Sequence, residues 1–168
     1  MYLGTHACMP VLVVSAIDIV RLITGKTKIL NNRQLVFIGL AGILPDVLWP
    51  HFSMQQRLNS WTHTVWFLII LAPVVFILAK WKIKQNYLKF SVIFWLAVSL
   101  HLLMDALSGG IKFFFPFGDR IGDYYIAHPH WKIWELVFVG STSILIFVRY
   151  SVKRYLHKKN NTGQQTVN

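Results

Sequence analysis

Hydrophobic runs separated by short polar connections make up most of the chain. The runs cover residues 7–23, 35–49, 65–79, 90–107 and 133–148. A membrane-spanning helix needs about 17–25 residues, and the third and fourth runs reach this length with their flanks. The first two runs are short, so we expect them to be tilted, interfacial or buried by neighbouring helices. The pattern predicts an all-α, polytopic membrane bundle of about five transmembrane or membrane-embedded helices, with four as the smaller count.

Composition agrees with a membrane protein and excludes several other classes. Of the 168 residues, 55% are hydrophobic and 14% are charged, whereas ordinary soluble domains carry about 25% charged residues. The single cysteine, Cys8, excludes an intramolecular disulfide and any zinc site built on several cysteines. We expect one membrane-embedded domain over residues 1–150 and a basic, then polar, disordered cytoplasmic tail over residues 151–168.

The basic residues gather in alternate connections between the runs. Thirteen of the seventeen lie within residues 21–33, 80–89 and 149–159. The positive-inside rule then places the N-terminus outside and the C-terminus in the cytoplasm, which suits an odd number of spans. We therefore interpret the net charge of +11 as orientation and contact with anionic lipid, and expect no nucleic-acid partner. Asp18 and Arg21, at i and i+3, are expected to form an ion pair.

Acidic and imidazole side chains fall mainly at the opposite, outer ends of the runs. His6 begins the first run, Asp46 ends the second, His63 begins the third, and His101 and Asp105 end the fourth. Ionisable groups at membrane depth cost about 2.5–3.5 kcal/mol each and usually mark function. The i, i+4 spacing puts His101 and Asp105 on one helix face, where both can bind one ion. Imidazole with carboxylate suits zinc, and also manganese or iron. We expect these five residues to bind a divalent cation.

Short motifs that occur in order along the chain extend this interpretation. They read TH at residues 5–6, GLAGILPD at 39–46, WTHT at 61–64, HLLMDALSGG at 101–110 and FPF at 115–117. Over most of residues 1–140 the chain resembles the YdjM-like family of predicted bacterial membrane-bound metal-dependent hydrolases. The resemblance implies a multi-pass protein of the bacterial inner membrane and a metal-dependent hydrolase activity. With the topology above, its site faces the extracytoplasmic side.

The order of these residues is also similar to the ligand order of zinc-dependent phospholipase C. This more distant similarity implies one metal site made of Asp46, His63, His101 and Asp105. It further implies that Asp105, together with His6, begins a second site.

The chain departs from the YdjM-like pattern at two potential ligands. Leu48 stands where the common form has a second aspartate, and Leu58 stands where it has a histidine. The departure implies either that fewer ions are held or that His51 or Glu135 substitutes.

The expected reaction is hydrolysis of a phosphoester in a lipid or lipid-linked substrate at the outer face of the membrane. A metal-activated water would attack, and Asp46 or Asp105 would accept its proton. Arg57, Lys112 and Arg120 lie on the correct side to meet a phosphate.

Three other interpretations stay open at this stage. His101 and Asp105 could form a buried hydrogen-bonded pair with no ion. The chain could be a degenerate relative that binds metal without catalysis, or a scaffold. A transporter of protons or ions could use Asp105, His101 and Glu135, although transport sites tend to lie near the membrane midplane.

Overall fold

The computed structural model describes residues 3–50, 53–122 and 130–165, and in these ranges it is all-helical, as predicted. The elements are α1 (Leu3–Ile23), α2 (Asn32–Leu48), α3 (Met54–Leu58), the 3₁₀ turn η1 (Trp61–His63), α4 (Val65–Lys82), α5 (Tyr87–Leu107) and α6 (Trp131–Gln165). Side-chain caps define several helix starts. At α2, for example, the side chain of Asn31 accepts from the backbone N–H of Gln34, whose own side chain accepts from the backbone N–H of Asn31.

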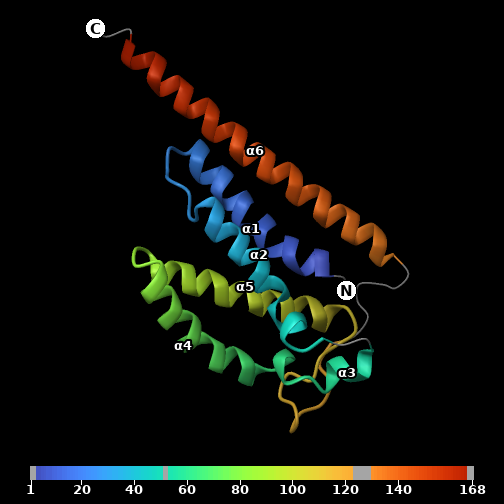
Figure 1. Cartoon of the computed structure of the whole chain (residues 1–168). Helices are drawn as coiled ribbons and strands as arrows, with labels where there is room; N and C mark the ends of the chain where they lie inside the picture. The colour runs from blue at the N-terminus through green and yellow to red at the C-terminus, as the bar shows by residue number, and fades with distance from the viewer. Residues whose placement is uncertain (1–2, 51–52, 123–129, 166–168) are drawn as a thin grey trace.

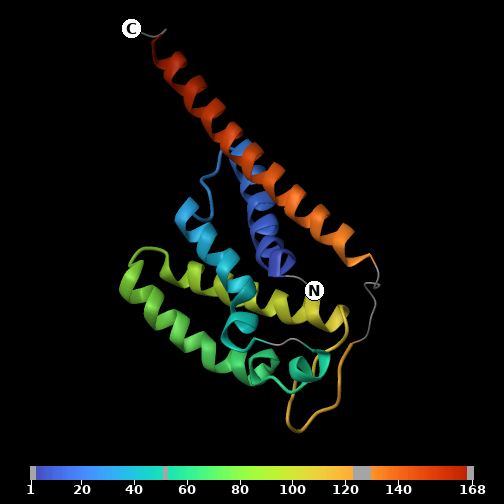
Figure 2. The ribbon, with the colours of Figure 1, turned by 45° about the vertical axis from the view of Figure 1, so that its right-hand side comes forward.

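The five long helices pack in a row in which each contacts the next. The order is α6, α1, α2, α5 and α4, so neighbours in space are not always neighbours in sequence (Figures 1 and 2). The core between them is apolar, with Ile38, Ala41, Val98 and Leu102 almost fully buried. Because α2 and α5 each lie between two other helices of the row, the ends of these two helices can carry buried polar groups.

Four helices in the described ranges are long and apolar enough to cross a membrane. They are α1, α4, α5 and the part of α6 from Lys132 to Leu156. The fifth long helix, α2, has 17 residues and therefore extends over about 26 Å, which is less than the roughly 30 Å of a bilayer core. It packs between α1 and α5, while Val36, Phe37 and Leu40 on it are exposed. The first run was also expected to be short, but α1 has 21 residues and is long enough to span a membrane.

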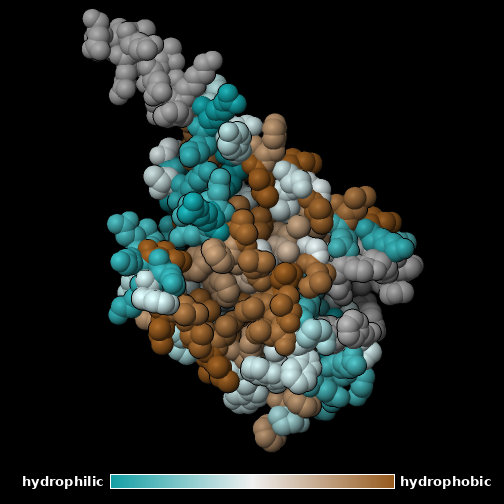
Figure 3. Space-filling view, in the orientation of Figure 1, coloured by the Kyte–Doolittle hydropathy of each residue, from teal (hydrophilic) through white to brown (hydrophobic). Residues whose placement is uncertain are grey.

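One face of the bundle is apolar across its centre and more polar toward its ends. Figure 3 shows hydrophobic side chains across the centre of one face and hydrophilic ones toward its ends. Large apolar side chains on the spans are exposed, among them Ile70, Ile77 and Leu103. An apolar surface of this extent is typical of a protein that lies in lipid.

The two ends of the bundle differ in their elements. The α1–α2 and α4–α5 connections lie at one end, where the C-terminal half of α6 also emerges (Figures 1 and 2). These segments and the helix ends beside them carry the thirteen basic residues noted above, so we call this the basic end. At the opposite end lie α3, η1 and the loop over residues 108–122.

Two features of the basic end differ from expectation. The expected ion pair between Asp18 and Arg21 is wrong, because Oδ2 of Asp18 lies 2.8 Å from Nη2 of Arg149, while Nε of Arg21 donates to the carbonyl of Thr27. The true partner is 131 positions away and cannot be found from helical spacing. In addition, α6 extends to Gln165 and therefore includes most of the segment 151–168 that was expected to form a separate tail.

Candidate metal centre

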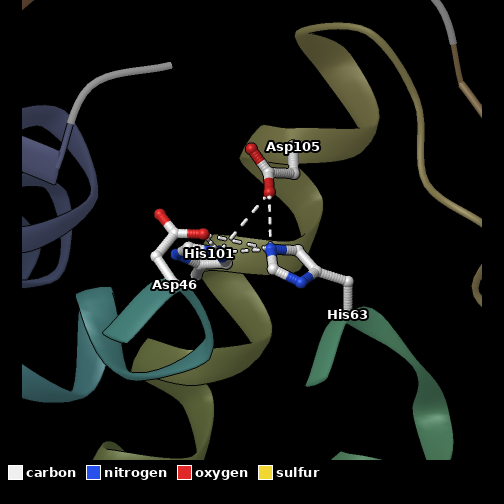
Figure 4. Close-up of side chains that lie close together, drawn as sticks. All are labelled: Asp46, His63, His101 and Asp105. Carbon is white, nitrogen blue, oxygen red and sulfur yellow. Dashed lines mark hydrogen bonds and ion pairs between the residues drawn. The ribbon is translucent and has the colours of Figure 1, made fainter. Parts of the chain in front are cut away.

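Four polar side chains from three different elements meet at the end of the bundle opposite the basic end. Asp46 lies in the last turn of α2, His63 ends η1, and His101 and Asp105 lie one turn apart near the end of α5. Figure 4 shows the four side chains directed toward one another. One ligand atom from each lies within 4.8 Å of the others. We call these four residues the Asp–His cluster.

The distances from the two imidazole nitrogens of the Asp–His cluster match those between the ligands of a small metal ion. Nε2 of His63 lies 3.1 Å from Oδ2 of Asp105 and 3.2 Å from Oδ1 of Asp46. Nε2 of His101 lies 3.4 Å and 3.5 Å from the same two oxygens. The two Nε2 atoms are 3.3 Å apart. Tetrahedral zinc at about 2.0–2.1 Å from each ligand places the ligands about 3.3 Å from one another.

Three of the four side chains are almost completely buried. The exposed fraction is 0–2% for His63, His101 and Asp105, and 14% for Asp46. Oδ2 of Asp105 accepts no hydrogen bond in the described part of the chain. A buried carboxylate oxygen without a donor is costly unless a cation or a proton compensates it.

The hydrogen bond on the other side of His101 fixes the tautomer of its ring. Nδ1 of His101 lies 2.7 Å from the carbonyl oxygen of Gly42. A carbonyl only accepts, so Nδ1 carries the proton and donates it, and in the neutral ring Nε2 keeps its lone pair. Metal-binding histidines commonly donate to a carbonyl in this way. Nε2 of His101 is therefore available to bind a metal ion.

Two neighbouring hydroxyl groups show that the ring of His63 also carries its proton on Nδ1. The hydroxyl of Thr62 donates to the carbonyl of Pro45 at 3.1 Å, so its proton is used. The hydroxyl of Ser60, 2.7 Å from that of Thr62, must then donate to it. Nδ1 of His63 lies 3.2 Å from both hydroxyl oxygens, neither of which has a proton left to give. Nδ1 is therefore the donor, and Nε2 again turns its lone pair toward the cluster.

The chemistry of the Asp–His cluster thus fits a divalent cation. Two carboxylate oxygens and two imidazole lone pairs converge, and all four are acceptors when both rings are neutral. Nitrogen and oxygen ligands in this number suit zinc, and also manganese or iron. The hydroxyl chain of Ser60 and Thr62 and the carbonyl of Gly42 escaped sequence analysis. Thr62 and Gly42 lie within two of the motifs and Ser60 directly precedes one of them, but their roles depend on how α2 packs against η1 and α5.

The second oxygen of Asp105 faces two further side chains. Nε2 of His6 lies 3.3 Å from this Oδ1, and Nη1 of Arg57 donates to it at 2.9 Å. Nη2 of Arg57 donates to the carbonyls of Ser108 and Gly110, both at 3.3 Å. Arg57 is only 3% exposed. The structure therefore places Arg57, the expected phosphate contact, beside Asp105 in the interior.

His6 completes the set of five expected ligands. It is buried, and its ring packs on that of His101 with 4.0 Å between the ring centroids. His6 does not belong to the Asp–His cluster, but its Nε2 contacts Oδ1 of Asp105, the oxygen that faces away from the cluster. The structure therefore brings all five residues into one place, although they come from four separate parts of the sequence.

The remaining expected site residues lie farther out or outside the described residues. Glu135 is half-buried near the start of α6 and packs against Gly4 on α1. Lys112 and Arg120 lie on the loop after α5, where Arg120 packs against Gly110 and is exposed. His51 lies outside the described residues.

The fold and the Asp–His cluster define a class, the multi-pass membrane bundles with a buried carboxylate–imidazole centre. A model of the YdjM inner membrane protein family matches residues 1–166. The chain therefore belongs to this family and is an inner-membrane protein. No curated protein and no solved structure matches it.

Proposed function

We propose that the protein is a metal-dependent hydrolase that cleaves a phosphoester of a lipid or lipid-linked substrate at the outer face of the membrane. The convergence of four acceptor atoms in the Asp–His cluster carries this proposal. We further propose that the N-terminus lies outside and the C-terminus in the cytoplasm, which follows from the gathering of basic residues at one end.

Asp46, His63, His101 and Asp105 would hold one divalent ion, with zinc preferred. Such an ion, when bound, supplies Lewis-acid polarisation of a phosphoryl oxygen and lowers the pKa of water toward neutrality. A single ion is favoured because Arg57 already contacts the oxygen of Asp105 that faces away from the cluster. Its positive charge stands where a second ion shared with His6 would need to bind. Leu48 and Leu58 supply no ligand atoms, which agrees with a single ion.

Asp46 is the better candidate to accept the proton of the attacking water. Oδ1 of Asp105 already contacts Arg57 and His6, and its Oδ2 would bind the ion. Asp46 is the most exposed member of the cluster, so water reaches its carboxylate first. A carboxylate within hydrogen-bond reach of the reacting water is the usual general base in such a site.

Position and charge support a phosphorylated lipid as the substrate class. The Asp–His cluster lies at the ends of α2 and α5, where a lipid headgroup would meet the protein while its chains stay in the bilayer (Figure 1). Arg57 adds a buried positive charge beside the cluster, where it already donates to Asp105, and Lys112 and Arg120 on the adjoining loop are the charges that could meet a phosphate. Arginine and lysine are the usual partners of phosphate oxygens.

The activity can be tested on the purified full chain in mixed micelles. Phospholipids with phosphodiester headgroups and lipid phosphomonoesters are supplied with added zinc or manganese, and headgroup or phosphate release is measured. We expect release by the wild type and a loss of at least about a hundredfold in His63→Ala. The matched control His130→Ala, which changes an exposed histidine, should retain activity. No release by metal-loaded wild type on any of these lipids would contradict the hydrolase.

A non-catalytic metal-binding protein is the second candidate. The near-complete burial of His63, His101 and Asp105 favours it, because a structural metal site is closed whereas a catalytic one keeps an open position. Metal bound at full occupancy without release of any product would support this candidate over the hydrolase.

A further inference from the structure

An apolar groove between α2 and α6 has no part in the proposed hydrolysis. Its floor is α1, which contacts both helices, and its volume is about 640 Å³. Apolar side chains line most of its length, including Val11, Leu35, Val36, Ile146 and Phe147. Several of them are exposed. We call this feature the α2–α6 groove; it runs from the middle of the bundle to the basic end.

The groove becomes polar where it reaches the basic end. Lys28, Asn32, Arg149 and Tyr150 line it there. A second, polar pocket of about 800 Å³ shares Lys28 and Asn32 with the groove and adds Lys153, among others. The apolar α2–α6 groove therefore adjoins the polar pocket. This arrangement suits a lipid, which has an apolar tail and a polar headgroup.

The positive charge at this junction is not balanced by the protein. Asp18 is engaged by Arg149 at 2.8 Å, and its other oxygen accepts the backbone N–H of Ile29. Among the described residues that line the groove and the polar pocket, none is acidic. Lys28 and Lys153 therefore add positive charge beside an ion pair that is already complete.

The excess of positive charge at the junction affects the pKa of Lys28. It lies half-buried on the α1–α2 connection. Burial, followed by the positive charges of Arg149 and Lys153, lowers the pKa of its ammonium group. An anion at the junction would offset both the cost of burying the ammonium group and its repulsion from Arg149 and Lys153.

We propose that the α2–α6 groove and the polar pocket bind one anionic phospholipid, with an acyl chain in the groove and the headgroup phosphate between Lys28 and Lys153. The charge of the junction is complementary to the phosphate, and the exposed apolar walls face the bilayer. Basic pockets between helices on the cytoplasmic side are known to bind anionic headgroups. This lipid lies at the opposite end of the bundle from the Asp–His cluster and is not the proposed substrate.

Native mass spectrometry of the full chain tests the proposal. The protein is released from nanodiscs that contain equal amounts of phosphatidylglycerol and phosphatidylcholine, and the ratio of the two lipids retained is measured. We expect the wild type to retain one phosphatidylglycerol, with a preference of about tenfold or more, since each lysine near a headgroup favours the anionic lipid several-fold. In the double variant Lys28→Gln/Lys153→Gln this preference should fall about tenfold.

Two further variants distinguish lipid binding in the groove from general attraction of anionic lipid by surface charge. Lys80→Gln/Lys89→Gln removes the same charge from exposed positions on α4 and α5 and should keep the preference. Ser143→Trp fills the groove, whose wall includes Ser143, and should abolish retention of both lipids. Equal retention of the two lipids by the wild type, or an equal fall in the control, would overturn the proposal. So would a lipid-free dimer that Ser143→Trp dissociates, because a second copy would then cover the groove.

Discussion

Nε2 of His63 and Nε2 of His101 lie 3.3 Å apart in the interior of the protein, and each ring donates its Nδ1 proton away from the other. His101 donates to the carbonyl of Gly42 and His63 to the hydroxyl pair of Ser60 and Thr62. Two lone pairs thus face the same point as two carboxylate oxygens. A cation is the simplest group that stabilises such an arrangement.

Removal of the hydroxyl that orients His63 should weaken metal binding without removing a ligand. In Ser60→Ala the Nδ1 proton of His63 loses one of its two acceptors. We expect zinc affinity to fall about 10–100-fold, as is usual for outer partners of metal-binding histidines. Chelator competition measures the affinity. Ser99→Ala is the control, because Ser99 donates to the carbonyl of Trp95 on its own helix; an equal loss there would contradict the role of Ser60.

Gly42 allows α1 and α2 to approach closely beside the Asp–His cluster. A Cβ atom at this position would collide with the carbonyl oxygen of His6. We expect Gly42→Ala to lower the free energy of unfolding by about 1–3 kcal/mol and to reduce bound metal. Gly140→Ala provides the comparison, since its Cβ would meet no atom within 4 Å; this change should be neutral or stabilise α6 by about 0.5–1 kcal/mol. Tryptophan fluorescence during thermal unfolding in detergent distinguishes the two.

The ion pair between Asp18 and Arg149 joins α1 to α6 in the interior. Both side chains are almost fully buried, so Asp18→Asn leaves a buried guanidinium without its counter-charge. We expect a loss of about 3–5 kcal/mol in the free energy of unfolding. Arg21→Gln should lose about 1 kcal/mol or less, because Arg21 contributes one hydrogen bond to the carbonyl of Thr27. Similar losses in the two variants would count against the assignment of Arg149 as the partner.

The proposed orientation in the membrane predicts which loops an impermeant thiol reagent reaches. In a Cys8→Ala background, Asp119→Cys places a thiol on the loop beside the candidate metal centre, and Gln85→Cys places one at the basic end. Both positions are exposed. We expect Asp119→Cys to react in intact cells, and Gln85→Cys to react only after the inner membrane is made permeable. The reverse pattern would place the Asp–His cluster on the cytoplasmic side.

The sequence predicted the residues of the candidate centre better than it predicted the side chains that hold those residues in place. Ionisable residues at the ends of apolar runs are rare enough to attract attention, and the i, i+4 spacing of His101 and Asp105 follows from helix geometry alone. The contact of Arg57 with Asp105 spans 48 positions, and that of Asp18 with Arg149 spans 131. Such contacts depend on which helices become neighbours, and hydrophobic pattern does not specify that order.

The same limit applies to the fold. The runs predicted five long helices and the shortness of the second, because length and apolarity are local properties, whereas the first helix is longer than its run, with 21 residues. The row in which α1 lies between α6 and α2 is a tertiary property, as is the hydroxyl chain that turns His63 toward the cluster.

Metal content of the purified full chain, determined by elemental analysis, tests the central claim most directly. The wild type is compared with the double variant His101→Ala/Asp105→Ala, and both are checked for a folded, monodisperse elution profile. We expect about one zinc or manganese ion per chain in the wild type and none in the variant. A well-folded wild type that holds no metal, even after zinc and manganese are added back, would contradict a metal centre. The Asp–His cluster would then be a set of buried ion pairs between carboxylates and imidazolium rings.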